Sequence, residues 1–151
     1  MTTDRIEKSV LVRAPRALVW RALSDVDAFG EWFGVKLNES FNPGAQVRGK
    51  VTLPGYENLP FEMTIERMEP EHHLSWRWHP YAINPQLDYS SEPTTLVTFE
   101  LEEVPGGTRV HVVESGFDAI PDSRRQEAYQ ANEKGWAMQM ENINRYVSKA
   151  A

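Results

Sequence analysis

The chain has 151 residues, of which 40% are hydrophobic and 25% charged, and it carries a formal net charge of −6 and no cysteine. This length predicts a single domain spanning residues 1–151, with a core that needs neither disulfides nor cysteine-bound zinc. The acidic balance and the scattered basic residues argue against nucleic-acid binding, which needs a basic stripe to displace counterions from phosphate.

Nothing in the chain is typical of a secreted or membrane-spanning protein. The N-terminal residues M-T-T-D-R-I-E-K lack an apolar signal region. No stretch approaches the roughly 20 apolar residues that cross a bilayer. We therefore expect a cytoplasmic protein without a membrane span.

The first 34 residues predict one strand followed by two short helices. The expected elements are a strand over residues 5–13 and helices over 16–24 and 25–34. Pro15 suits the first turn of a helix, and Asp25 is a plausible N-cap for the second helix. Gly30 and Gly34 are expected to mark breaks in that second helix.

The middle of the chain predicts a run of antiparallel strands, because apolar and polar residues alternate between turn signals. The expected strands cover residues 35–41, 46–53, 61–66, 73–80, 97–102 and 109–114. The longest predicted loop covers residues 80–94, and a second loop covers residues 54–60. P-G-G at 105–107 predicts a hairpin turn.

The last segment predicts one long amphipathic helix of roughly 26 residues after Pro121 and Asp122. Trp136, Met140, Ile143 and Val147 recur at spacings of four, three and four residues. A sheet with one apolar face needs a cover, and this helix is the expected one.

Six short motifs in this order resemble those of the START-like (SRPBCC, helix-grip) superfamily. They are A-P-x-x-x-V-W-x-A-L-S-D at 14–25, W-F-G at 32–34, L-S-W at 74–76, G-G-T-R-V at 106–110, E-S-G-F at 114–117 and N-E-K-G-W at 132–136. The branch they resemble is the family homologous to the activator of a heat-shock chaperone ATPase. The resemblance implies an α+β fold, in which a curved antiparallel sheet of about six or seven strands grips the C-terminal helix on its concave face.

That fold would bring many large side chains to one region between the sheet and the last helix. Trp76 and Trp78 share a strand face and are expected to point toward the helix, as Phe99 and Val112 do. These residues could simply fill the core, or they could leave a cavity of roughly a few hundred Å³ between them. The candidate ligand-binding residues are Trp32, Phe33, Trp76, Trp78, Phe99, Val112, Glu114, Phe117, Trp136 and Met140.

Glu114 is the unusual member of this set, because it follows Val110 and Val112 on the inward face of its strand. An ionised carboxylate in apolar surroundings is costly unless it is paired. Three interpretations stay open: a salt bridge to an arginine near the rim, exposure at the strand end, or a role in ligand anchoring or acid–base chemistry.

Other catalytic chemistries find little support. The four histidines, His72, His73, His79 and His111, lack the spacing of a metal site, so neither a metal nor another cofactor is expected. The sequence has no G-x-S-x-G and no P-loop.

We therefore expect a cavity that binds a small, mostly apolar or aromatic ligand, with Glu114, His79 or Tyr81 orienting it. The loops at 80–94 and 54–60 would frame the entrance. One alternative is a polyketide-cyclase- or hydrolase-like enzyme that uses Glu114 as its general base. Another is a co-factor that acts by its surface on a chaperone ATPase or on some other protein.

Overall fold

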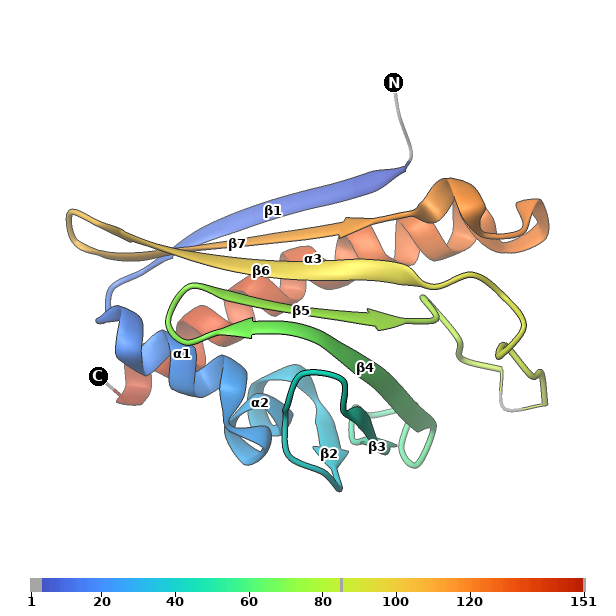
Figure 1. Ribbon diagram of the computed structural model, residues 1–151, viewed down its shortest axis with the longest axis horizontal. Coiled ribbons are helices and arrows are strands. Elements are labelled where there is room, and N and C mark those ends of the chain that lie inside the picture. The colour runs from blue at the N-terminus through green and yellow to red at the C-terminus, as the bar shows by residue number, and fades with distance from the viewer. Residues whose placement is uncertain (1–3, 85, 151) are drawn as a thin grey trace.

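The computed structural model describes residues 4–84 and 86–150, which form a curved antiparallel sheet packed against a long C-terminal helix (Figure 1). The strands are β1 (Arg5–Val12), β2 (Val35–Leu37), β3 (Gln46–Val51), β4 (Pro60–Glu69), β5 (His73–Trp78), β6 (Thr95–Val104) and β7 (Gly107–Ser115). The helices are α1 (Arg16–Ser24), α2 (Val26–Phe33), the short 3-10 helix η1 (Phe117–Ala119) and α3 (Asp122–Ala150). The predicted α+β helix-grip architecture is confirmed.

The two short helices connect the two edges of the sheet, because the first two strands in the chain are its edge strands. The sheet runs β1-β7-β6-β5-β4-β3-β2, so β1 and β2 are its two edges. The helices α1 and α2 join these edges, and every neighbouring pair of strands is antiparallel. In Figure 1 α3 runs along the sheet behind β5, β6 and β7.

The two short helices begin and end where local chemistry predicts, with one exception. Pro15 precedes α1 as its N-cap residue, and the Asp25 carboxylate accepts the backbone N–H groups of Asp27 and Ala28 at the start of α2. Gly34 ends α2 in the left-handed conformation, with φ of 96°. The prediction that Gly30 breaks this helix was wrong. Gly30 lies inside α2, where an added Cβ would stand 2.3 Å from the Val35 carbonyl oxygen.

The strand predicted over residues 35–41 is much shorter in the structure, and a side chain explains why. Pairing between β2 and β3 ends at Leu37. The backbone N–H of Arg48 then donates to the Glu39 carboxylate at 2.8 Å, where a longer β2 would have supplied a carbonyl. Phe41 leaves the sheet and is buried, with its ring 5.3 Å from that of Phe29.

The core lies between the concave face of the sheet and α3, and its inward positions follow the predicted alternation. Val97, Phe99 and Leu101 of β6 are buried, as are Val110, Val112 and Glu114 of β7. On α3 the predicted apolar face is confirmed. Its buried residues are Ala128, Trp136, Met140, Ile143 and Val147. None of the helices in the described part of the chain has the length and apolar character needed to span a membrane.

Two glycines show how differently the same small residue is used. An added Cβ at Gly49 in β3 would stand 1.9 Å from the Lys36 carbonyl oxygen, so only glycine allows β2 to approach there. An added Cβ at Gly135 in α3 would meet nothing within 4 Å.

The substitution Gly→Ala should therefore have opposite effects at these positions. Gly49→Ala forces β2 away and should lower the free energy of unfolding by about 1–3 kcal/mol. Gly135→Ala removes glycine from a helix interior and should raise it by about 0.5–1 kcal/mol. Urea unfolding followed by circular dichroism measures both. A stable Gly49→Ala protein would contradict the close approach of β2.

Candidate ligand-binding cleft

Nine aromatic rings from five elements and one loop pack into a continuous group, called here the aromatic cluster. Its members are Phe29, Trp32, Phe33, Phe41, Phe61, Trp76, Trp78, Phe99 and Trp136, with neighbouring ring centroids 4.7–6.4 Å apart. Sequence reasoning named six of these rings as site residues and did not name Phe29, Phe41 or Phe61. Phe61 was detectable as an inward position of its strand. Phe41 has the parity of Val35 and Leu37 in the strand predicted over 35–41, but the structure buries it from the loop after β2 and not from a strand.

Much of the aromatic cluster is core rather than cavity wall. The side chains of Trp76 and Phe99 are fully buried, and their rings stack at 5.6 Å. The structure separates Phe117 from the cluster and packs it against Tyr129 at 5.3 Å. Val112 and Met140 are also buried. The rings therefore fill most of the space in which a cavity was expected, and open space begins at the edge of the cluster.

That open space is a cleft of about 730 Å³ at one end of the sheet. Its walls come from the end of α2, the 52–61 segment, the loop after β5 and one face of α3. Phe33 and Trp78 are the two predicted ligand-binding residues that line it, and they join it to the aromatic cluster. Its other aromatic lining residues are Tyr56, Phe61, Tyr81 and Tyr89, and α3 contributes Ala131, Asn132, Gly135 and Gln139.

The two loops expected at the entrance both line this cleft. Tyr56 and Leu59 come from the 54–60 loop, and Tyr81 and Leu87 come from the 80–94 loop. Both loops leave the same end of the sheet in Figure 1, where β4 begins and β5 ends. His79, which follows β5, also lines the cleft.

The rim of the cleft is unusually apolar for an exposed surface. Leu53, Tyr56 and Leu87 all line the cleft, yet their exposed fractions are 41%, 49% and 54%. Scattered apolar side chains are normal on protein surfaces, but a group of them around a concavity is typical of a binding site.

Behind the cleft lies Glu114, fully buried and bound by four neutral hydrogen-bond donors. Its Oε1 accepts from Asn132 Nδ2 at 2.9 Å and Trp136 Nε1 at 2.8 Å. Its Oε2 accepts from Trp78 Nε1 at 2.8 Å and Thr95 Oγ1 at 2.5 Å. Four donors occupy the acceptor sites of a carboxylate, which is how a buried acidic group can be tolerated without a cation.

This geometry decides among the structural interpretations of Glu114. The strand-end position is not exposed, and none of the ion pairs in the described part of the chain includes Glu114. The expected salt bridge is therefore replaced by neutral donors. Because Trp78 and Asn132 line the cleft and both bind Glu114, the carboxylate holds two wall residues in place from behind.

The loop wall of the cleft is held by Arg124, near the start of α3. Its guanidinium donates to the Glu92 carboxylate, with a shortest contact of 2.8 Å, and to the carbonyl oxygens of Pro80 and Tyr81 at 3.1 Å each. It also lies over the Tyr89 ring, 4.7 Å from the centroid. Tyr81 has a positive φ of 53°, an uncommon conformation for a bulky residue, so these bonds hold the turn in which it lies.

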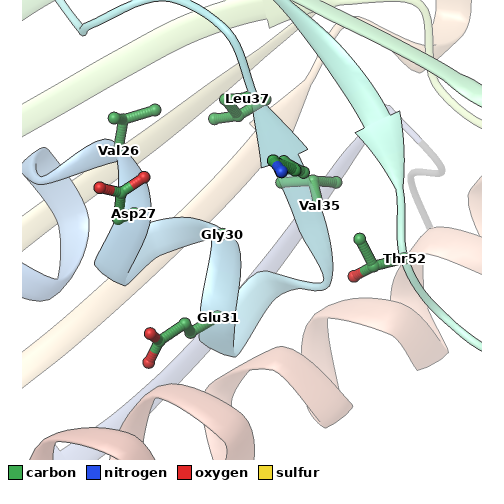
Figure 2. A pocket seen from close by; sticks show the side chains of 8 residues that line it. Val26, Asp27, Gly30, Glu31, Val35, Leu37 and Thr52 are labelled. Carbon is green, nitrogen blue, oxygen red and sulfur yellow. The ribbon is translucent and has the colours of Figure 1, made fainter.

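A second hollow, of about 480 Å³, lies between α2 and β2 (Figure 2). Figure 2 shows Asp27 and Glu31 on α2 and Val35 and Leu37 on the neighbouring β2. The described residues that line this hollow include no aromatic side chain, and three of them are charged: Asp27, Glu31 and Lys36. The cleft beside the aromatic cluster is therefore the better candidate for an apolar ligand.

Within the described residues no three acidic or histidine side chains are grouped as metal ligands.

Glu114→Gln tests the four-donor arrangement. The new amide NH₂ would face two donors that no longer have an acceptor, so the free energy of unfolding should fall by at least about 2 kcal/mol. Near-ultraviolet circular dichroism should also change, because Trp78 and Trp136 lose their anchor. Glu103→Gln, at an exposed site, is the control and should change neither signal. An unchanged Glu114→Gln protein would contradict the anchoring role.

Arg124→Lys tests the loop anchor, because lysine keeps the charge but not the planar fork of donors. Limited proteolysis should cut the 80–94 loop several times faster, with the cut sites mapped by mass spectrometry. Arg125→Lys is the matched control. Its side chain donates to the carbonyl oxygens of Asp118 and Ile120 and pairs with Asp122, and none of these described partners lies in the 80–94 loop. Equal cleavage in both variants would show that Arg124 does not hold the loop.

Solved structures with the same architecture come from several bacteria. The protein MLL2253 from Mesorhizobium loti shares 20% identity and a TM-score of 0.76, over 97% of this chain and 98% of that one. NE0264 from Nitrosomonas europaea shares 17% identity and a TM-score of 0.77, over 99% and 97%. DynU16, from the dynemicin biosynthetic locus, shares 24% identity and a TM-score of 0.74, over 97% of this chain and 48% of that one. At these identities the similarity shows a common fold.

The search of curated protein sequences finds no significant match to the chain. The family model described as Activator of Hsp90 ATPase homolog 1-like protein matches residues 13–148. This match covers nearly the whole described structure and includes the positions of all six sequence motifs. The chain therefore belongs to the Activator of Hsp90 ATPase homolog 1-like family, within the helix-grip superfamily.

Proposed function

We propose that this protein binds a small, mostly apolar or aromatic molecule in the cleft beside the aromatic cluster. The observation that carries the proposal is the cleft itself, with a volume of about 730 Å³ and six aromatic side chains in its wall. Volumes of roughly 300–1,000 Å³ with apolar walls and a few polar groups are typical of small-molecule sites. Of the ligand-binding residues expected from the sequence, Phe33 and Trp78 would contact the ligand, and the others would support these two.

The apolar rim supports the same function. Leu53, Tyr56 and Leu87 keep large apolar surfaces in contact with water around the mouth of the cleft. Covering such surface is favourable by roughly 25 cal/mol per Å². A bound apolar molecule that reaches the rim would cover it.

The placement of Glu114 favours binding over acid–base catalysis by this residue. The carboxylate is fully buried, and Trp78 and Asn132 stand between it and the cleft. A general base must come within hydrogen-bond reach of the proton that it removes. For Glu114 to do so, at least one of its four donors would have to leave. We therefore assign Glu114 the role of holding the wall, and the enzyme is the less favoured alternative.

Gly135 offers a way to fill the cleft without disturbing the core. It lines the cleft, and an added Cβ there meets nothing within 4 Å. Gly135→Phe should therefore place a ring in the open space. The matched control is Met138→Phe, which places the same ring on the outer face of the same helix, where Met138 is 58% exposed.

Binding is measured with N-phenyl-1-naphthylamine, a neutral aromatic probe whose fluorescence rises in apolar surroundings. We expect saturable binding to the unmodified protein and to Met138→Phe, and at least about tenfold weaker binding to Gly135→Phe, equivalent to about 1.4 kcal/mol. Equal binding to all three proteins would show that the probe binds elsewhere. Absence of binding to the unmodified protein would contradict the proposal.

The family description favours a second candidate, a co-factor that acts by its surface on a chaperone ATPase. Such an activity would not need an open cleft. Stimulation of a chaperone ATPase that is retained by Gly135→Phe would support this candidate, whereas stimulation lost with the filled cleft would connect the two functions.

A further inference from the structure

The charged and polar groups of the cleft favour one kind of ligand end group over others. Among the described lining residues Glu62 and Asp88 are acidic, and none is lysine or arginine. Glu62 alternates with the inward Phe61, so its carboxylate lies on the outward face of β4, where Gln46 Nε2 donates to it at 2.7 Å and Arg48 lies at 3.9 Å. Asp88 is therefore the acidic side chain that can face the cleft. Hydrogen bonds from the side chain and backbone of Ser90 lower the pKa of Asp88, so its carboxylate is ionised at neutral pH.

Arg124 is the guanidinium that borders this wall, and it is not free to bind a ligand. Glu92, two backbone carbonyl groups and the face of Tyr89 already surround it. An anionic ligand entering the cleft would therefore find no lysine and no unpaired arginine among the groups described here, and it would approach the Asp88 carboxylate.

Two neutral polar residues of the cleft, Asn132 and His79, can offer acceptors to a ligand. Asn132 holds its amide nitrogen on Glu114, which leaves its carbonyl oxygen for another partner. His79 places Nε2 3.0 Å from the Glu92 carbonyl oxygen, so this nitrogen donates and Nδ1 of the neutral ring is the acceptor. Tyr81 lies close enough to the Glu127 carboxylate for that charge to act on its phenol. Burial, with Glu127 adding to it, raises the pKa of this phenol and keeps it neutral.

The faces of the aromatic wall suit a cation as well. Tyr56, Tyr81 and Tyr89 line the same cleft, and a guanidinium already lies over one of these rings. Aromatic faces attract cations through the ring quadrupole, and more strongly where water is excluded.

We infer that the cleft selects aromatic molecules whose polar end is a hydrogen-bond donor, with a protonated amine preferred, and that it discriminates against carboxylates and phosphates. This inference rests on the proposed function, because it concerns the same cleft. The aromatic body would lie against Phe33 and Trp78, and the ammonium or hydroxyl group would lie near the acceptors of Asp88 and Asn132.

Three molecules with one aromatic body test this selectivity: 1-pyrenemethylamine, 1-pyrenemethanol and 1-pyrenecarboxylic acid. Their dissociation constants are measured by pyrene fluorescence at pH 7 and low ionic strength, and again at 0.5 M salt. We expect the amine to bind most tightly, the alcohol next, and the carboxylate at least about tenfold more weakly than the amine. The difference between amine and carboxylate should shrink at high salt, because salt screens exposed charges.

A pair of single variants assigns the effect to the cleft. Asp88→Asn should weaken the amine about three- to tenfold and leave the alcohol unchanged. Glu103→Gln removes one charge from an exposed site outside the cleft lining and should change neither probe.

The outcomes separate this inference from the proposal on which it rests. If the carboxylate binds as tightly as the amine, or if Asp88→Asn and Glu103→Gln weaken the amine equally, the selectivity is wrong while ligand binding stands. If none of the three probes binds the unmodified protein, ligand binding in this cleft fails, and the selectivity fails with it.

Discussion

The buried carboxylate of Glu114 joins the parts of this fold on which the cleft depends. Its donors come from β5, β6 and α3, while Glu114 itself lies on β7, so one side chain connects three neighbouring strands to the helix. A charge in the core is costly, and each donor that offsets this cost is also fixed in place by it. The wall residues Trp78 and Asn132 are therefore held through a group that does not itself line the cleft.

The position of the cleft follows from how large rings pack. Where the sheet and α3 face each other, the aromatic cluster fills the space, with Trp76 and Phe99 fully buried. Toward the end of the sheet the strands give way to loops, and Gly135 leaves the helix without a side chain on that side. Open space therefore remains between the 54–60 and 80–94 loops and α3, beyond the edge of the aromatic cluster. The loop wall persists because Arg124 ties it to α3.

The same bonds that stabilise the cleft also set its polarity. Trp78 and Asn132 donate their side-chain N–H groups to Glu114, and Arg124 forms an ion pair with Glu92. These donors are therefore not available to a ligand. What faces the open space is consequently rich in acceptors and aromatic faces. Structural support and ligand preference are thus two results of one arrangement of hydrogen bonds, so changes to the support should also change what binds.

The sequence was sufficient to predict the sheet from the alternation of apolar and polar residues along its strands. It was also sufficient to predict the long helix and its apolar face from the spacing of Trp136, Met140, Ile143 and Val147. Both periods are local properties of the backbone, so they can be read from the sequence. The order of motifs was sufficient to predict the family. The early end of β2 and the place of Gly30 inside α2 depended on contacts with Glu39 and Val35, which local pattern does not contain. The partners of Glu114 lie 18–36 residues away along the chain, so only the tertiary structure could decide that four neutral donors, rather than an arginine, surround it. The sequence also indicated which aromatic residues come together between the sheet and α3. Where their rings fill that space, and where the cleft remains open, depends on contacts between residues distant in the chain, so only the tertiary structure decided it.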